Sequence, residues 1–242
     1  RTLEHLVDAV LMLEGDRYGS LRLLRALKNR HGSTEEVGVM EMAADGLHAV
    51  TDTAAAFLGS GQREAPGMAV AAILEGSRPL LVEVQALVAP AAGMGPPRRT
   101  VAGLDSNRLA LLIAVLARRA GVDVSARDVY ASLAGGLTVS EPALDLPLAM
   151  AIAASVRDRA LPADTLACGE VSLLGEIRPV QGLDRRLREA ARLGFRRAIV
   201  PAGTSPGSRN PAPSPAPLEV VPVASLREAL EVGFGVAGGT SG

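Results

Sequence analysis

Hydrophobic and polar residues follow two different periods along this chain of 242 residues. Apolar runs bounded by Gly, Pro, Asn or Asp predict strands, and apolar residues three and four positions apart predict helices. The predicted strands cover residues 6–14, 21–28, 37–42, 47–50, 68–75, 80–88, 128–133, 166–171, 173–180, 197–200 and 218–221. The predicted helices cover residues 103–120, 144–159, 183–193 and 225–232. Alternating strands and helices, with antiparallel hairpins among them, indicate an α/β (α+β) fold.

The predicted elements fall into two groups separated by a stretch of linker composition. Residues 51–66 are poor in branched apolar side chains and include Gly59-Ser60-Gly61. Such composition is typical of a connection between domains. We therefore expect domains at residues 1–60 and 61–235, with a tail at 236–242. A Pro- and Ser-rich excursion is expected at residues 203–217, and a turn at residues 15–19.

The predicted helix at residues 103–120 has the clearest amphipathic pattern. Its expected buried face consists of Leu104, Leu111, Leu112, Val115 and Leu116. Asp105 and Asn107 lie where a helix begins, so capping is favoured over a catalytic role for them. At residues 183–193 a second amphipathic helix is expected to end at Gly194.

Cysteine content and hydropathy restrict the environment of the protein. A single cysteine, Cys168, excludes an internal disulfide and a Cys-rich zinc site. Its apolar neighbours favour a buried core position over a reactive thiol. The histidines His5, His31 and His48 are scattered and suggest no metal site.

No apolar run approaches the roughly 18 residues of a membrane helix, and no signal peptide is visible, so we expect a cytoplasmic protein without membrane contact. Because the chain begins at Arg1 rather than Met, we interpret it as a piece of a longer protein.

Lysine is almost absent, which limits nucleotide chemistry. The chain has 25 Lys and Arg residues, yet Lys28 is the single lysine. A phosphate-binding P-loop needs a Gly-rich turn followed by Lys and Ser or Thr. Lys28 instead follows Leu27 and precedes Asn29. This chain by itself therefore has no P-loop with which to bind and hydrolyse ATP.

Positive charge is concentrated in two blocks, although the net charge is only −1. Residues 98–127 carry six arginines against Asp105 and Asp123, and residues 178–197 carry seven against Asp184 and Glu189. If the blocks meet in space, they would form a face for a polyanion. The alternatives are solvated helix surface and salt bridges between subunits. Aromatic residues amount to 2% with no Trp, so stacking on nucleic-acid bases is not expected.

A polar cluster closes the second predicted strand. Lys28-Asn29-Arg30-His31-Gly32 places an ammonium and a guanidinium at the strand end, where they could meet a phosphate or form an ordinary turn. Together with Glu14-Gly15-Asp16-Arg17 and Gly38-Val39-Met40-Glu41-Met42, this segment resembles the bacterial RadA (Sms) family of DNA-repair proteins, relatives of the RecA recombinase. His31 stands where that family usually has Phe.

This resemblance implies that residues 1–60 are the last strands of a RecA-like ATPase core. The P-loop that binds ATP and Mg, and the zinc motif of the family, would lie in a part of the protein outside this chain. Lys28 and Arg30 would then sense ATP in trans, by reaching the nucleotide of a neighbouring subunit.

The second domain resembles the proteolytic domain of Lon proteases, which has a ribosomal protein S5 domain 2-like fold. The similar stretches are Pro66–Val70, Gly135-Gly136, Glu141–Asp145, Gly169–Val171, Gly175–Val180, Gly182-Leu183 and Ala190–Phe195. In active Lon proteases a lysine activates a nucleophilic serine. Here the serine position is Ala143 and the lysine position is Asp184, and Ser140 is too far along the loop to take over. We therefore expect an inactive peptidase site.

The two resemblances together imply a DNA-repair protein whose Lon-like domain is a scaffold for DNA binding and oligomerisation. This chain by itself is not expected to be an enzyme or to hold a cofactor, whereas the full-length protein would be a DNA-dependent ATPase that drives branch migration. Expected partners are single-stranded or branched DNA bound without sequence preference, copies of the same chain in a hexameric ring, and RecA recombinase. The candidate DNA contacts are Arg98, Arg99, Arg108, Arg118, Arg119, Arg127, Arg178, Arg185 and Arg186. A purely structural ring-forming domain and an active Lon-like serine peptidase are the alternative functions.

Overall fold

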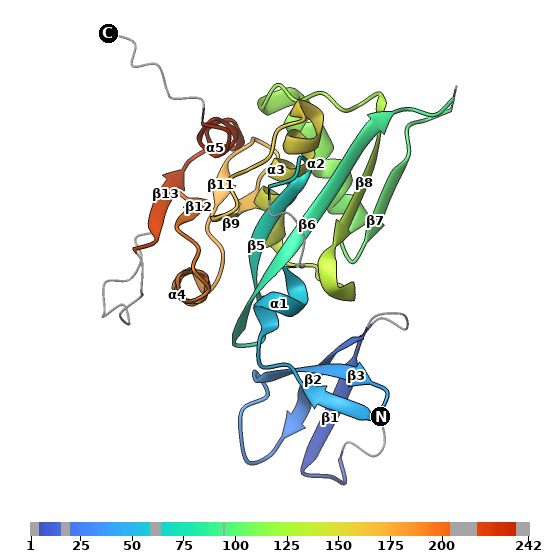
Figure 1. Ribbon diagram of the computed structural model, residues 1–242, viewed down its shortest axis with the longest axis vertical. Helices are drawn as coiled ribbons and strands as arrows, with labels where there is room; N and C mark the ends of the chain where they lie inside the picture. Colours follow the sequence, from blue (N-terminus) through green and yellow to red (C-terminus); the bar gives the residue numbers. More distant parts are fainter. Residues whose placement is uncertain (1–4, 16–19, 59–63, 94, 204–216, 236–242) are drawn as a thin grey trace.

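The protein contains two main β-sheets, a small one from the first part of the chain and a larger one from the remainder (Figure 1). The computed structural model describes residues 5–15, 20–58, 64–93, 95–203 and 217–235. Several sequence-based expectations lie outside these described residues. They are most of the turn at 15–19, the linker glycines and the boundary at residues 60 and 61, nearly all of the 203–217 excursion, and the tail at 236–242. The mixture of helices with parallel and antiparallel strands confirms the α/β class.

The small sheet is antiparallel throughout, in the order β1-β2-β3-β4. Its strands are β1 (Ala9–Glu14), β2 (Leu21–Asn29), β3 (Val37–Ala43) and β4 (Gly46–Ala49). On one face Leu23 pairs with Val39, and both are buried. This face packs beside the short helix α1 (Thr53–Phe57), whose Phe57 is fully buried. Phe57 and Leu21 both lie against the backbone of Gly135, so the small sheet and the larger part of the molecule share one core.

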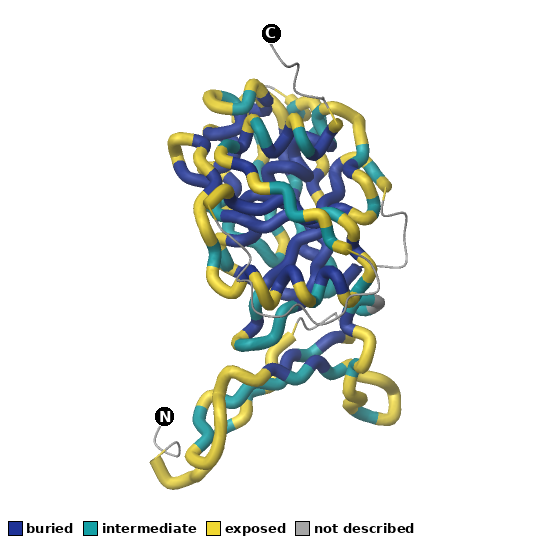
Figure 2. Tube along the Cα trace, turned by 90° about the vertical axis from the view of Figure 1, so that its left-hand side faces the viewer, coloured by how far each residue is buried: buried dark blue, intermediate teal, exposed yellow. Residues whose placement is uncertain are grey.

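The opposite face of the small sheet is also apolar but is exposed. Leu11 pairs with Ala26, Leu13 with Leu24, and Met42 with Leu47. Leu11, Leu13, Met42 and Leu47 are exposed. In Figure 2 the buried residues are concentrated in the larger part of the molecule, and few lie in the small sheet. The small sheet thus has a second apolar face that the described residues leave uncovered.

The larger sheet has seven strands in the order β13-β12-β9-β5-β6-β8-β7. They are β5 (Met68–Glu75), β6 (Arg78–Pro90), β7 (Arg99–Ala102), β8 (Arg127–Leu133), β9 (Thr165–Ala167), β12 (Arg197–Pro201) and β13 (Glu219–Val223). The β5–β6 and β6–β8 pairs are antiparallel, and the other pairs are parallel. A separate two-stranded hairpin consists of β10 (Glu170–Val171) and β11 (Ile177–Arg178).

Helices cover both faces of the larger sheet. The helical elements are α2 (Ser106–Arg119), α3 (Asp145–Arg157), α4 (Leu183–Arg192) and α5 (Leu226–Gly233), with 3-10 turns η1 (Ala134–Gly136) and η2 (Pro142–Leu144). Successive residues of a strand point to opposite faces. Ala71 of β5 belongs to the core formed with α2, α3 and α5, whereas its neighbour Ala72 belongs to the core that includes Leu187 of α4. Helix α4 therefore lies on the opposite face of the sheet from the other three.

Most predicted elements are present, and the differences have physical reasons. Strand β7 was not predicted, because it is a short edge strand that begins at Arg99 and alternates between half-buried and exposed residues. The strand predicted at residues 173–180 shortens to β11, since Leu173 and Leu174 form the turn of the hairpin. Leu111 was predicted to be buried in α2, but it is 40% exposed.

The helix ends follow the predicted chemistry. The Asp105 carboxylate accepts hydrogen bonds from the backbone N–H groups of Asn107 and Arg108, at 2.8 and 2.9 Å, so its role as a cap is confirmed. Asn107 lies inside the helix instead of capping it. Gly194 follows α4 with a φ of +85°, as expected for a residue that ends a helix in the left-handed region.

Candidate functional site

The polar cluster at the end of β2 lies on the surface of the small sheet. Lys28 donates a hydrogen bond through Nζ to the backbone oxygen of Val7 at 2.8 Å. Arg30 forms an exposed ion pair with Asp8, with an Nη1–Oδ1 distance of 3.3 Å. Asn29 Oδ1 accepts from the backbone N–H of His31 and closes the turn. Lys28 and Arg30 are therefore both held by the segment just before β1, and both remain near the surface.

The two positions expected to carry a peptidase dyad are occupied by incompatible side chains. Ala143, in η2, is fully buried among apolar residues of the α4 face. Asp184 is exposed in the first turn of α4, and its backbone oxygen accepts from Arg188 Nε at 3.2 Å. Ser140 is exposed on the loop before η2. Neither dyad position offers a hydroxyl or an amine.

A buried ion pair lies beside these positions. Arg186 of α4 is fully buried and pairs with Glu141, and its Nε also donates to the Gln181 oxygen at 3.0 Å. The backbone N–H of Leu74 donates to Glu141 Oε2 at 2.9 Å. The prediction that Arg186 contacts DNA is wrong, because the side chain has no exposed surface. Position 186 lies one helical turn from Leu183 and Ala190, so helix periodicity could have placed it on the buried face.

Cys168 belongs to the same apolar core. It is fully buried, which confirms the predicted core position. Burial raises the pKa of its thiol to about 12, although the nearby positive charge of Arg186 acts in the opposite direction. A thiol with such a pKa is protonated at neutral pH and is a poor nucleophile.

A second ion pair joins three elements on the other face of the sheet. Arg108 of α2 contacts the carboxylate of Asp145, with an Nε–Oδ1 distance of 3.0 Å. Asp145 is almost fully buried at the start of α3 and also accepts from the backbone N–H of Val171 in β10, at 3.1 Å. Arg108, predicted to contact DNA, is thus held in a structural contact and is partly buried. Asp145 lies 37 residues from Arg108, so no sequence pattern indicated this partner.

The arginines near β7 differ in their surroundings. Arg99 donates to the backbone oxygens of Val124 at 2.9 Å and Ser125 at 3.1 Å, and also to that of Arg127. It therefore ties the loop before β8 to the edge strand. Arg98 and Arg127 are exposed. Arg98 also donates through its backbone N–H to Asp128, at 2.7 Å.

The remaining candidate arginines divide between the two faces of the sheet. Arg118 and Arg119 are exposed at the end of α2, while Arg185 is exposed on α4, across the sheet. The two basic blocks therefore do not form one continuous face. Arg178 of β11 is the exception, because its hairpin lies beside α2. Arg227, which was not among the predicted DNA contacts, donates from Nη2 to the Arg119 oxygen at 3.2 Å and joins Arg118, Arg119 and Arg178 on the α2 side.

Within the described part of the chain, no group of three or more His, Cys, Asp or Glu residues could hold a metal ion. No helix in that part is both long and apolar enough to cross a bilayer.

Comparison with known proteins gives a consistent relationship. The family described as "Subunit ChlI of Mg-chelatase" matches residues 105–204. The protein named DNA repair protein RadA from Pseudomonas aeruginosa is 49% identical over 97% of this chain and 50% of its own length. Proteins of the same name are 51% identical in Synechocystis sp., over 84% of this chain and 40% of their length, and 44% identical in Bacillus subtilis, over 97% and 50%. The chain spans about half the length of these relatives. It belongs to the RadA family of bacterial DNA-repair proteins.

Proposed function

We propose that this chain is the DNA-binding and oligomerisation half of an ATP-driven motor that moves branches in DNA during repair. Its larger domain would be a Lon-like scaffold, and its small sheet the end of a RecA-like ATPase core. ATP and Mg would bind to the other half of the full-length protein, which would also hold zinc. The partners would be single-stranded or branched DNA, copies of the chain in a hexameric ring, and RecA recombinase.

The DNA-binding role is supported chiefly by the arginines around the end of α2. Arg118, Arg119 and Arg178 are exposed, and Arg227 contacts the backbone of Arg119. Gly175 in the hairpin turn lies close to the Arg119 side chain, so Arg178 and Arg119 belong to one region. Guanidinium groups in such a cluster suit the spaced phosphates of a nucleic-acid backbone. Helix α2 also ends there, and the positive charges of these arginines interact favourably with the negative end of its dipole.

The uncovered face of the small sheet supports the proposed link to an ATPase core. An exposed sheet face with four large apolar side chains is unusual for a complete domain. A RecA-like core that precedes this sheet would cover it. Lys28 lies near the end of β2 and Arg30 directly after it, where a nucleotide on a neighbouring subunit could be reached.

The alternative of an active peptidase has no support at the expected site. Ala143 has no nucleophile, and the buried Glu141–Arg186 pair occupies the space between the η2 loop and α4. A purely structural ring remains the competing proposal, because exposed arginines also form intersubunit salt bridges.

The proposal is tested by DNA binding at graded salt concentrations. Fluorescence anisotropy with a labelled duplex and a labelled single strand should give a log–log slope of about −0.9 or −0.7 per neutralised phosphate. Arg118→Ala, Arg119→Ala and Arg178→Ala should weaken binding to all sequences alike, and each should reduce the slope by about one unit because one phosphate is no longer neutralised. Arg192→Ala, an exposed charge on α4 that pairs with Glu189, is the matched control and should change neither quantity.

Light scattering on the same samples separates the two proposals. If the oligomer persists and the salt slope is unchanged in all three variants, the α2 side is not the DNA site. If the variants dissociate the oligomer and DNA affinity falls only through reduced avidity, the structural ring is supported instead. Arg185→Ala, measured in parallel, tests whether the opposite face of the sheet contributes a separate contact.

A further inference from the structure

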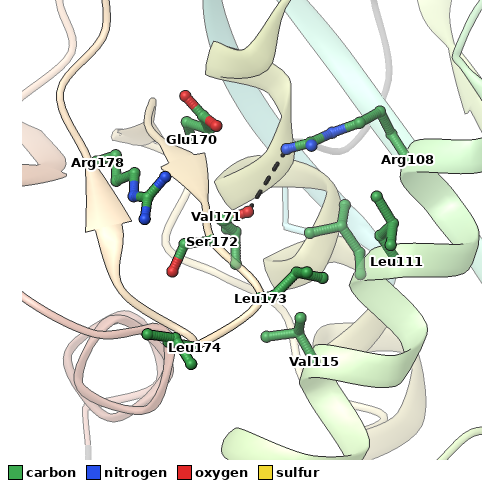
Figure 3. Close-up of a pocket in the computed structure, with 10 residues that line it drawn as sticks. Arg108, Leu111, Val115, Glu170, Val171, Ser172, Leu173, Leu174 and Arg178 are labelled. Carbon is green, nitrogen blue, oxygen red and sulfur yellow. Dashed lines mark hydrogen bonds between the residues drawn. The ribbon is translucent and has the colours of Figure 1, made fainter.

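A groove of about 230 Å³ lies between α2 and the β10–β11 hairpin, and Arg108 and Arg178 border it (Figure 3). Leu111, Leu112 and Val115 line it from α2, and Leu173 and Leu174 line it from the hairpin turn. Leu111, Leu173 and Leu174 are 40%, 65% and 62% exposed. The groove therefore presents an aliphatic surface to solvent at the tip of a hairpin.

The hairpin is held firmly, so its leucines cannot easily turn inward. The backbone N–H of Leu226 donates to the Gly175 oxygen at 2.8 Å, and that of Ile177 donates to the Ala224 oxygen at 3.0 Å. Gly175 has a φ of +82°, and a Cβ there would lie 2.9 Å from the Arg119 side chain. These contacts fix the turn against both α5 and α2. The exposed leucines are thus a preformed surface, which lowers the entropic cost of binding a partner.

The charges around the groove favour an anionic partner. Arg108 and Arg178 line it from opposite sides, and Figure 3 shows the guanidinium groups of both turned toward the β10 strand between them. The charge of Arg108 is already paired with Asp145, so Arg178 is the cation that the groove offers to a partner. Arg178 is 54% exposed and lies 3.6 Å from Glu176, too far for a strong pair. Arg119 and Arg227 stand beside the turn. Glu170, the cross-strand neighbour of Arg178, also lines the groove, but its carboxylate lies at one end and points away from the leucines in Figure 3.

We propose that this groove binds a short acidic segment of a partner protein. An aliphatic or aromatic side chain of that segment occupies the surface formed by Leu111, Leu173 and Leu174. The adjoining carboxylates contact Arg178, since a guanidinium fork matches a carboxylate. DNA fits this groove less well, because a phosphate backbone has no apolar group to place on leucines and no aromatic side chain lines the groove for stacking. Arg178 is common to this groove and to the proposed DNA site, whereas the leucines belong to the groove alone.

The probe is a fluorescein-labelled peptide of four aspartates followed by two leucines, titrated with the 242-residue chain and followed by anisotropy. Two matched peptides replace the aspartates by asparagines or the leucines by serines. Both should bind about tenfold more weakly, because one lacks the carboxylates and the other lacks the apolar side chains. The double variant Leu173→Ser/Leu174→Ser and the variant Arg178→Glu should each weaken binding of the first peptide to a similar extent.

Controls separate this site from general surface effects. Leu87→Ser removes another exposed leucine, on β6, and Arg196→Glu reverses another exposed charge; both should leave peptide binding unchanged. Leu173→Ser/Leu174→Ser should leave the salt slope of DNA binding unchanged, so the two proposals can fail separately. Equal binding of all three peptides, or unchanged binding by the leucine double variant, overturns the proposal. Dissociation of an oligomer by that variant in light scattering also overturns it, because a second copy of the chain then covers the groove.

Discussion

Asp128 holds the edge of the larger sheet together although the sequence marks it only as the start of a strand. Its carboxylate is 2% exposed and accepts from the backbone N–H groups of Arg98 at 2.7 Å and Ala92 at 3.3 Å. The hydrogen bond from Arg98 lowers the pKa of this carboxyl, and the bond from Ala92 adds to the effect. A single charged group therefore satisfies two backbone donors in the loop that leads into β7.

The pH dependence of stability follows from this lowered pKa. A carboxylate whose pKa is lower in the folded state stabilises the fold above its ordinary pKa of about 4 and loses that contribution as pH falls through the folded-state value. Asp128→Asn should therefore lower the melting temperature at pH 7, and the gap from wild type should narrow as the pH falls below about 4. Circular dichroism during thermal unfolding, between pH 3 and pH 7, measures the melting temperatures of the wild type and the variant. A constant gap across this range would assign the effect to packing rather than charge.

Residue-scale predictions succeeded where local chemistry determines the outcome. The Asp105 cap depends on the next three residues, and the burial of Cys168 follows from its apolar neighbours. Arg186 was misplaced because its charge was given more weight than its position on the helix. Asp145 and Glu141 were missed as partners because Arg108 and Arg186 lie 37 and 45 residues away in sequence.

At the scale of elements, a buried ion pair fixes the η2 loop against α4. Arg186 contributes a fully buried guanidinium, and Glu141 a carboxylate that is 21% exposed. Besides this pair, Arg186 donates to the backbone oxygens of Gln181 and Ala72, and Glu141 accepts from Leu74. The ion pair and these hydrogen bonds together join three segments of the chain, namely strand β5, the η2 loop and the start of α4.

Removing one partner should be costly. Arg186→Met leaves Glu141 largely buried without its counter-charge and removes a hydrogen-bond donor from two backbone oxygens, so the free energy of unfolding should fall by about 3 kcal/mol or more. Arg185→Met, at the neighbouring exposed position of α4, should change it by less than about 0.5 kcal/mol. Urea unfolding of both variants provides the comparison.

The double variant Arg186→Met/Glu141→Leu distinguishes charge from shape. A buried pair replaced by apolar residues of similar volume is often nearly neutral, so the double variant should recover much of the stability. If it is as unstable as Arg186→Met alone, the backbone hydrogen bonds of Arg186 account for the effect and the ion pair does not.

Elements with a strong period or clear end signals were predicted well, and short elements were not. Helix α2 and strand β5 match their expected positions because a repeated apolar pattern and flanking glycines define them. Strand β7 depends instead on pairing with the distant strand β8, and the two strands of the β10–β11 hairpin are too short to show a period. The separation of the two basic blocks across the sheet is likewise a property of strand order, and charge counting along the chain could not show it.

At the scale of the whole molecule, the two sheets meet at the turn between β5 and β6. The backbone N–H of Ser77 donates to the Glu35 oxygen at 2.7 Å, and Glu75 pairs with Arg25 of β2 at 2.6 Å. Burial raises the pKa of the Glu75 carboxyl, and Arg25 partly offsets that rise. Because Arg25 lies on the same strand as Lys28, the strand that leads to the polar cluster is tied directly to the larger sheet.

This arrangement leads to a prediction for the full-length protein. If Lys28 and Arg30 reach the nucleotide of a neighbouring subunit, Lys28→Ala or Arg30→Ala should reduce ATP turnover by about a thousandfold, the lower range for a cation that stabilises the transition state in trans. Stability should change little, because the Arg30–Asp8 pair is exposed and such pairs contribute about 1 kcal/mol at most. ATP hydrolysis in the presence of DNA and thermal unfolding, measured on the same preparations, separate the effect on turnover from the effect on stability.

Lys28→Arg, which keeps a positive charge, should retain more turnover than Lys28→Ala, and Arg196→Ala should behave as wild type. Wild-type turnover in both alanine variants would mean that the cluster is an ordinary turn, held by Val7 and Asp8, and that another cation completes the nucleotide site.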